Sequence, residues 1–169
     1  LYNYKQIMKT FVVLLVLVTL TNCGFKVIKK SDFNNFNITE ITTEGDKRIN
    51  FKLKNKLLFN SNKENDNKVI IKIFSKKNKS IKEKNIKNEI TKYLLSISVD
   101  IKYIKLDGGS ESEFSVIKSS DYNVANQYSK TLSNEKKSID LLTNEIADEI
   151  LDNLRLNLND LGRFWGNHR

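Results

Sequence analysis

The most regular pattern of hydrophobic and polar residues in this chain runs from Leu95 to Tyr103. Every second residue there is apolar, and the residues between them are Ser, Asp or Lys. Such alternation places the apolar side chains on one face of a strand and the polar side chains on the other. Shorter stretches of the same kind predict strands at 33–41, 69–74 and 113–118. Asp107-Gly108-Gly109 predicts a turn that joins the last two strands as a hairpin.

Two other stretches have helical periodicity. In residues 47–59, Ile49, Leu53 and Leu57 recur every four residues, and Asp46 stands where a helix N-cap is expected. We expect Phe51 and Leu58 to lie beside this apolar stripe. A second helix of about 26 residues is predicted to begin at or near residue 133. Its apolar stripe consists of Ile139, Leu142, Ile146, Ile150, Leu154 and Leu158, widened by Ala147 and Leu151.

The order strand, helix, three strands, helix indicates an α+β protein. The expected architecture is a two-layer sandwich in which two helices pack on one face of a mainly antiparallel four-stranded sheet. Within the chain of 169 residues, we assign one domain to residues 23–160 and a flexible C-terminal tail to residues 161–169.

The N-terminal segment is typical of an export signal. A charged start at Met8-Lys9-Thr10 is followed by a mostly apolar run at 11–20. This run is shorter than the roughly 20 apolar residues that a transmembrane helix needs. We therefore interpret residues 1–22 as a signal peptide, with residues 1–7 upstream of the true start.

The signal ends at Leu20-Thr21-Asn22-Cys23, which resembles a bacterial lipobox. In such a motif the Cys becomes the lipidated first residue of the mature protein, so Cys23 is the predicted lipidation site. The alternative is a free or buried thiol. Gly24 follows, and lipoproteins without Asp at that position resemble the class sent to the outer membrane. The expected location is therefore the periplasmic face of that membrane, with attachment through the lipid anchor.

Composition narrows the chemistry that the chain can perform. It contains one Cys, no Pro and a single His, His168, close to its end. Cys-cluster metal sites, His-based zinc sites and catalytic triads therefore lack their usual parts. Asp148, Glu149 and Asp152 lie opposite the apolar stripe of their helix and are interpreted as a solvated face. We expect no catalytic residue, metal or cofactor, and no enzymatic activity.

At this point the chain resembles the LPS-assembly lipoprotein LptE family. The resemblance rests on Cys23-Gly24-Phe25 leading into a strand, an amphipathic helix, three long strands and a C-terminal amphipathic helix. It implies a two-layer protein that plugs the lumen of the β-barrel protein LptD as a heterodimer. It also implies a role in lipopolysaccharide transport to the cell surface and assembly there, without a cofactor.

The net charge of +9 is concentrated in one region. Between Lys68 and Lys105 there are eleven Lys and three acidic residues. The densest part, here called the hairpin lysines, consists of Lys76, Lys77, Lys79, Lys82 and Lys84, around a hairpin tip predicted at Asn78–Asn85. Clustered ammonium groups attract multiply charged anions. In the resembled family, basic residues near the sheet tip are thought to contact lipopolysaccharide, so this role is assigned to the hairpin lysines.

One alternative remains for the hairpin lysines and one for the function of the whole protein. The hairpin lysines also suit a solvated edge that prevents strand-to-strand aggregation. Nucleic acid is not an expected partner, because no aromatic residues interleave the cluster in a stacking pattern. For the whole protein, the alternative function is a periplasm-facing lipoprotein that binds a soluble ligand or cell-wall partner and has no role in lipopolysaccharide export.

Overall fold

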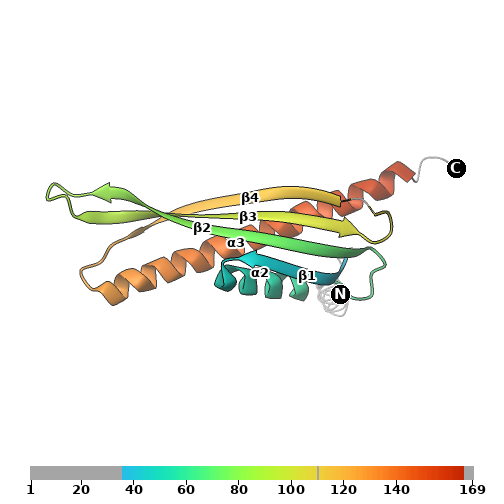
Figure 1. Ribbon diagram of the computed structural model, residues 1–169, viewed down its shortest axis with the longest axis horizontal. Coiled ribbons are helices and arrows are strands. Elements are labelled where there is room, and N and C mark those ends of the chain that lie inside the picture. The colour runs from blue at the N-terminus through green and yellow to red at the C-terminus, as the bar shows by residue number, and fades with distance from the viewer. Residues whose placement is uncertain (1–35, 110, 166–169) are drawn as a thin grey trace, which may run out of the picture.

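The computed structural model describes residues 36–109 and 111–165, with side chains as far as residue 158. The signal peptide, Cys23 and the last four residues of the predicted tail lie outside this range. The elements, shown in Figure 1, are β1 (Asn37–Gly45), α2 (Lys47–Phe59), β2 (Lys68–Lys84), β3 (Ile90–Lys105), β4 (Glu111–Asn123) and α3 (Tyr128–Trp165). The predicted order of strands and helices is confirmed.

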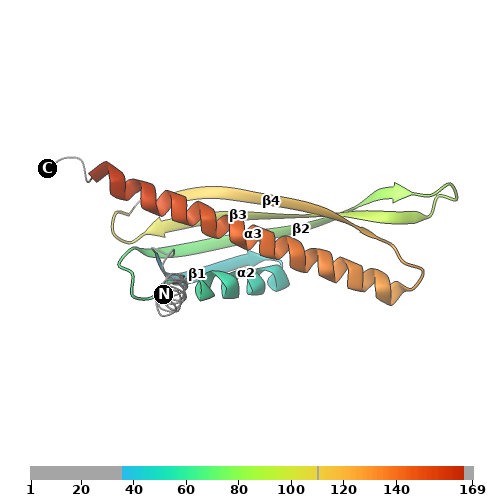
Figure 2. The ribbon, with the colours of Figure 1, turned by 180° about the vertical axis from the view of Figure 1, so that it is seen from behind.

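The four strands form one sheet in the order β1-β2-β3-β4. The β2–β3 and β3–β4 pairs are antiparallel, and β1–β2 is parallel. Parallel neighbours need a crossover connection, which α2 and its flanking loops provide. Figures 1 and 2 show both helices on the same side of the sheet. The predicted α+β fold, with two helices on one face of a mainly antiparallel sheet, is therefore confirmed.

Helix α2 begins where the sequence predicts. The Asp46 carboxylate accepts hydrogen bonds from the backbone N–H groups of Arg48 and Ile49, at 3.0 and 3.1 Å, and so caps the first turn. The three apolar residues spaced by four, Ile49, Leu53 and Leu57, are fully buried.

Phe51 and Leu58, which we expected beside the apolar stripe of α2, have exposed side chains that lie away from it. Each residue advances about 100° around a helix. Phe51 and Leu58 therefore both point almost opposite Ile49.

Helix α3 has the predicted buried stripe, from Ile139 to Leu158. It begins at Tyr128, five residues before the expected Ser133, and runs to Trp165. Its 38 residues give a length of about 57 Å, so the helix runs along most of the sheet, and the tip of the β2–β3 hairpin extends beyond it (Figure 2). The early start lacked a periodic signal, because the first turns carry few apolar residues. Within the described parts of the chain, neither helix combines the length and hydropathy that a bilayer crossing needs.

The β2–β3 hairpin is longer than predicted, and its tip lies elsewhere. Strand β2 continues to Lys84, so the tip predicted at Asn78–Asn85 is wrong; the turn falls between Lys84 and Ile90. Asn85 closes it by donating its backbone N–H to the Glu89 carbonyl, at 2.9 Å, and Asn88 adopts a positive φ of 63°. Figure 1 shows this hairpin projecting beyond the rest of the sheet.

The sheet has two different faces. The face under the helices carries the core, in which the apolar residues of β2 and β3 pack against α2 and α3. The other face, here called the open face, is not covered by either helix. Its side chains from β2, β3 and β4 include Lys72, Phe74, Lys76, Ser96, Ser98, Asp100, Lys102, Glu113, Ser115, Ile117 and Ser119. It is therefore a largely polar surface that also carries apolar residues, among them Phe74, Ile117 and the cross-strand pair Ile70 and Ile104.

Candidate functional site

The hairpin lysines do not form one continuous surface. Along β2, alternate residues point to opposite faces. Lys77 and Lys79 continue the row of Ser75 toward the helices, whereas Lys76 points to the open face. The cluster that the sequence shows as contiguous is therefore divided between the two sides of the sheet.

Three of the hairpin lysines are paired with acids from other elements. Lys77 Nζ lies 3.7 Å from Asp46 Oδ2, at the N-terminus of α2. Lys82 Nζ lies 3.0 Å from Asp121 Oδ2, on β4. The third, Lys79, lies 2.8 Å from Glu135 Oε2 on α3.

Lys79 is the centre of a cluster that links β2, β3, β4 and α3. Its ammonium lies 4.2 Å from the centroid of the Tyr93 ring and 5.4 Å from that of Tyr122. The Tyr122 hydroxyl donates to the same Glu135 oxygen, at 2.8 Å. The two rings lie 5.7 Å apart. We call these four residues the Lys79 cluster; it ties the root of the projecting hairpin to the N-terminal half of α3.

The pKa values in the Lys79 cluster reflect this pairing. Burial works to lower the pKa of Lys79, but its interactions with Glu135 and Tyr122 outweigh burial and hold the pKa well above its ordinary value. For Glu135, burial acts to raise the pKa, yet the hydrogen bonds from Lys79 and Tyr122 bring it below normal. Burial raises the pKa of Tyr122. Each group therefore keeps its neutral-pH protonation state, which suits a structural role.

Lys76 and Lys84 differ from the other hairpin lysines. Lys84 Nζ donates to the neutral Asn88 amide oxygen, at 2.9 Å. Lys76 makes no ion pair within the described residues. These two ammonium groups therefore keep a positive charge that no carboxylate of the described residues neutralises. They are the members of the cluster best placed to meet an external anion.

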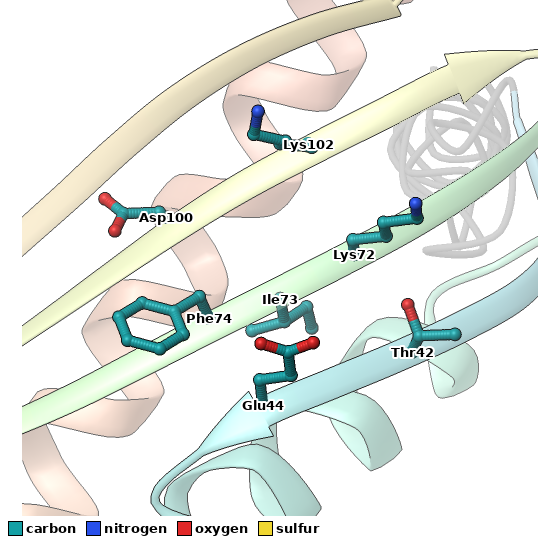
Figure 3. Close-up of a pocket in the computed structure, with 7 residues that line it drawn as sticks. All are labelled: Thr42, Glu44, Lys72, Ile73, Phe74, Asp100 and Lys102. Carbon is teal, nitrogen blue, oxygen red and sulfur yellow. The ribbon is translucent and has the colours of Figure 1, made fainter.

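The open face also holds a shallow hollow of about 380 Å³ (Figure 3). It is lined by Thr42, Glu44, Lys72, Ile73, Phe74, Asp100 and Lys102. Strand register arranges its polar side chains in two neighbouring rows. The first row runs Glu44–Phe74–Asp100 across β1, β2 and β3, and the second runs Thr42–Lys72–Lys102. Acidic groups therefore flank an aromatic ring in one row, and two ammonium groups face each other in the next.

Two side chains of the hollow are held by β4. Lys102 Nζ lies 3.1 Å from Glu113 Oε2, and Ser115 Oγ donates to Asp100 at 2.6 Å. Glu44 and Lys72 have no charged partner within the described residues. Sequence reasoning missed this hollow, because only the register of three strands brings these residues together. One local signal of the hollow was present in the sequence. Phe74 is an aromatic residue at a position of β2 whose neighbours on the same face, Lys72 and Lys76, are charged.

The three acids Asp148, Glu149 and Asp152 of α3 each pair with a different basic side chain. Lys56 pairs with Asp148 at 2.9 Å, and Arg155 pairs with Asp152 at 2.7 Å, while Glu149 faces Lys118 on β4. Within the described residues, no group of three or more potential ligand side chains is arranged to hold a metal ion.

Comparisons with known proteins identify similar folds. No protein-family model matches the chain, and no curated protein matches its sequence. The solution structure of uncharacterized lipoprotein B from Nitrosomonas europaea is similar over 76% of this chain and 88% of its own, with a TM-score of 0.56 and 15% identity.

Two crystal structures give lower TM-scores. Rare lipoprotein B from Shewanella oneidensis has a TM-score of 0.48 at 14% identity, covering 76% of this chain and 99% of its own. A minor lipoprotein from Acinetobacter baumannii has a TM-score of 0.48 at 15% identity, covering 70% and 94%. At these identities, the likeness to the Nitrosomonas structure establishes the fold and not the function.

Proposed function

We propose that this protein is an outer-membrane lipoprotein that plugs the lumen of the LptD β-barrel and assists lipopolysaccharide transport to, and assembly at, the cell surface. The observation that carries the proposal is the open face: a long, largely polar sheet surface, backed by two helices and left uncovered. The interiors of membrane β-barrels are polar. A polar surface of this kind is suited to such a lumen, whereas a lipid-facing protein would present an apolar one.

The proposed anchor is a lipidated Cys23. Two features support it: the lipobox-like Leu20-Thr21-Asn22-Cys23, and a fold shared with a protein described as a lipoprotein. Each buried methylene contributes about 0.8 kcal/mol to membrane attachment, so a Cys carrying several acyl chains is stably held. The anchor would keep the domain at the periplasmic face of the outer membrane, next to its barrel partner.

The proposed contact with lipopolysaccharide is electrostatic and involves no chemical step. All five hairpin lysines contribute to the positive field, and Lys76 and Lys84 are its least neutralised members. Phosphate groups on lipopolysaccharide are suitable partners for such a field, and the attraction should weaken as salt rises.

Reversing the two least neutralised charges tests this contact. Changing Lys76 and Lys84 to Glu should weaken lipopolysaccharide binding more than the same charge change at Lys54 and Lys63, which lie away from the hairpin on α2 and the loop after it. Equal effects of the two double variants on binding would show that the location of the charge is irrelevant, and would remove the hairpin from the proposal.

Co-purification tests the partner. Tagged protein, extracted gently from outer membranes, should bring a large β-barrel protein with it in stoichiometric amount. Recovery of the lipoprotein as a free monomer under conditions that preserve other outer-membrane complexes would contradict the proposal.

The second candidate is a periplasm-facing lipoprotein that binds a soluble ligand or a cell-wall partner. The hollow on the open face favours it, since its volume is within the usual range of small-molecule sites. Depletion separates the two functions. Loss of surface lipopolysaccharide with accumulation inside the envelope is expected for the first, and intact surface lipopolysaccharide for the second.

A further inference from the structure

The hollow on the open face contains features of a cation-binding site. Phe74 is 46% exposed, and in Figure 3 its ring lies in the open face between the side chains of Asp100 and Glu44. Both carboxylates are direct cross-strand neighbours of Phe74, and such neighbours have Cβ atoms about 5 Å apart. A cation placed over the ring would therefore lie near both carboxylates, although one Asp100 oxygen already accepts a hydrogen bond from Ser115 Oγ on β4.

The neighbouring row, Thr42–Lys72–Lys102, supplies positive charge. Lys72 is the cross-strand neighbour of Lys102, and Lys102 is already paired with Glu113. Lys72 has no acidic partner within the described residues, so its ammonium group is available to an anion. The two rows are two residues apart along the strands, a separation of about 7 Å.

We propose that this hollow binds a small zwitterion whose guanidinium or ammonium group lies over Phe74, between Glu44 and Asp100, and whose carboxylate reaches Lys72. In an extended arginine the guanidinium and the carboxylate are separated by about the spacing of the rows, and the α-ammonium lies beside the carboxylate. Every group that the assignment uses belongs to this chain, but the hollow lies on the face that the proposed barrel contact would cover, so the assignment concerns the protein free of its barrel partner. The ligands that suit the hollow are therefore guanidino and amino acids.

Three small molecules test the proposal on the folded protein. Amide chemical shifts of isotope-labelled protein are followed in titrations with L-arginine, L-citrulline and agmatine, at matched ionic strength. Citrulline has the same shape as arginine with a neutral end, and agmatine keeps the guanidinium but lacks the carboxylate. Arginine should give saturable shifts at and around Phe74, citrulline should give none, and agmatine should bind more weakly than arginine.

Variants of the hollow separate its two halves. Glu44→Gln combined with Asp100→Asn should weaken arginine binding about tenfold, by removing two partly exposed ion pairs. Phe74→Ala should weaken it about two- to fivefold, through loss of an exposed cation–π contact. Asp121→Asn, on the same sheet but about 20 Å along β4 from Ser115, is the matched control and should change nothing.

Several outcomes would overturn the proposal. Non-saturable shifts with arginine, or equal binding of citrulline, would exclude a cation site over Phe74. Equal binding of agmatine and arginine would exclude the role of Lys72. A loss of binding free energy in Asp121→Asn about half that in the Glu44 and Asp100 variant, as one removed charge against two would give, would attribute the effect to overall charge.

Discussion

Replacing Lys79 with Met should destabilise the domain, although Lys79 lies in a lysine-rich segment that looks like solvated surface. The change keeps the unbranched stem of the side chain and removes its charge. It abolishes the ion pair with Glu135 at 2.8 Å and the cation–π contact with Tyr93 at 4.2 Å. Glu135, whose side chain is only 18% exposed, keeps its hydrogen bond from Tyr122 but loses its counter-charge.

The expected loss follows from these contacts. A partly exposed ion pair contributes about 0.2–1 kcal/mol, and an exposed cation–π contact about 0.5–1 kcal/mol. Their sum predicts that Lys79→Met lowers the free energy of unfolding by about 1–2 kcal/mol, which corresponds to a fall in Tm of about 3–8 °C. The matched control is Lys76→Met, because Lys76 points to the open face and makes no ion pair within the described residues. We expect its Tm to stay within about 2 °C of wild type.

Thermal and urea unfolding of the domain, both followed by circular dichroism, measure the Tm and the free energy of unfolding of each variant. A double-mutant cycle with Glu135→Gln should give a coupling energy on the order of 1 kcal/mol between the two positions. If Lys79→Met and Lys76→Met are equally stable and the coupling energy is zero, the Lys79 cluster does not hold the hairpin to α3, and the reasoning from these contacts is refuted.

Three further predictions concern stability. The pKa of Glu135 is lowered in the folded state, so its contribution to stability is present above the unfolded-state pKa and is lost as pH falls through the folded-state pKa. Wild type should therefore lose more stability than Glu135→Gln between about pH 5 and 3. Urea midpoints that change in parallel for the two proteins across that range would contradict this. Gly45→Ala should cost about 3 kcal/mol or more, because a Cβ at its φ of +98° would collide with the Ser75 carbonyl, whereas Gly108→Ala, with open space around it, should be neutral in the same assay. Leu142→Ala should cost about 2–5 kcal/mol, as measured by thermal unfolding, and equal Tm values for this variant and the exposed neighbour Leu141→Ala would contradict the assigned face of α3.

The fold was largely predictable because its core follows simple periodicities. Ile97, Val99 and Ile101 alternate with polar residues over a whole strand, and all three are fully buried. The stripe of α3 repeats at three or four residues for several turns. Where β2 passes Ser75, polar residues occupy both faces, so no periodicity marked its continuation. The hairpin tip was consequently misplaced, and the true turn depends on the local hydrogen bonds of Asn85.

The site could be predicted only in part, because charge counted along the chain omits partners that folding supplies. Lys79 and Glu135 are 56 residues apart, yet they share a hydrogen bond. Likewise, Glu44, Phe74 and Asp100 belong to three strands and become neighbours only through register. A local excess of Lys in the sequence therefore does not predict which ammonium groups remain without an acidic partner in the fold.

Site-specific photocrosslinking in intact cells tests the proposed barrel partner most directly. A photoreactive residue replaces Ile117, which is 64% exposed on the open face, or Leu141, which is 54% exposed on the outer side of α3. If the open face lies against the barrel lumen, Ile117 should give an adduct with a large outer-membrane protein, and Leu141 should give little or none. Absence of a barrel adduct from Ile117, or an equally strong one from Leu141, would contradict the proposal.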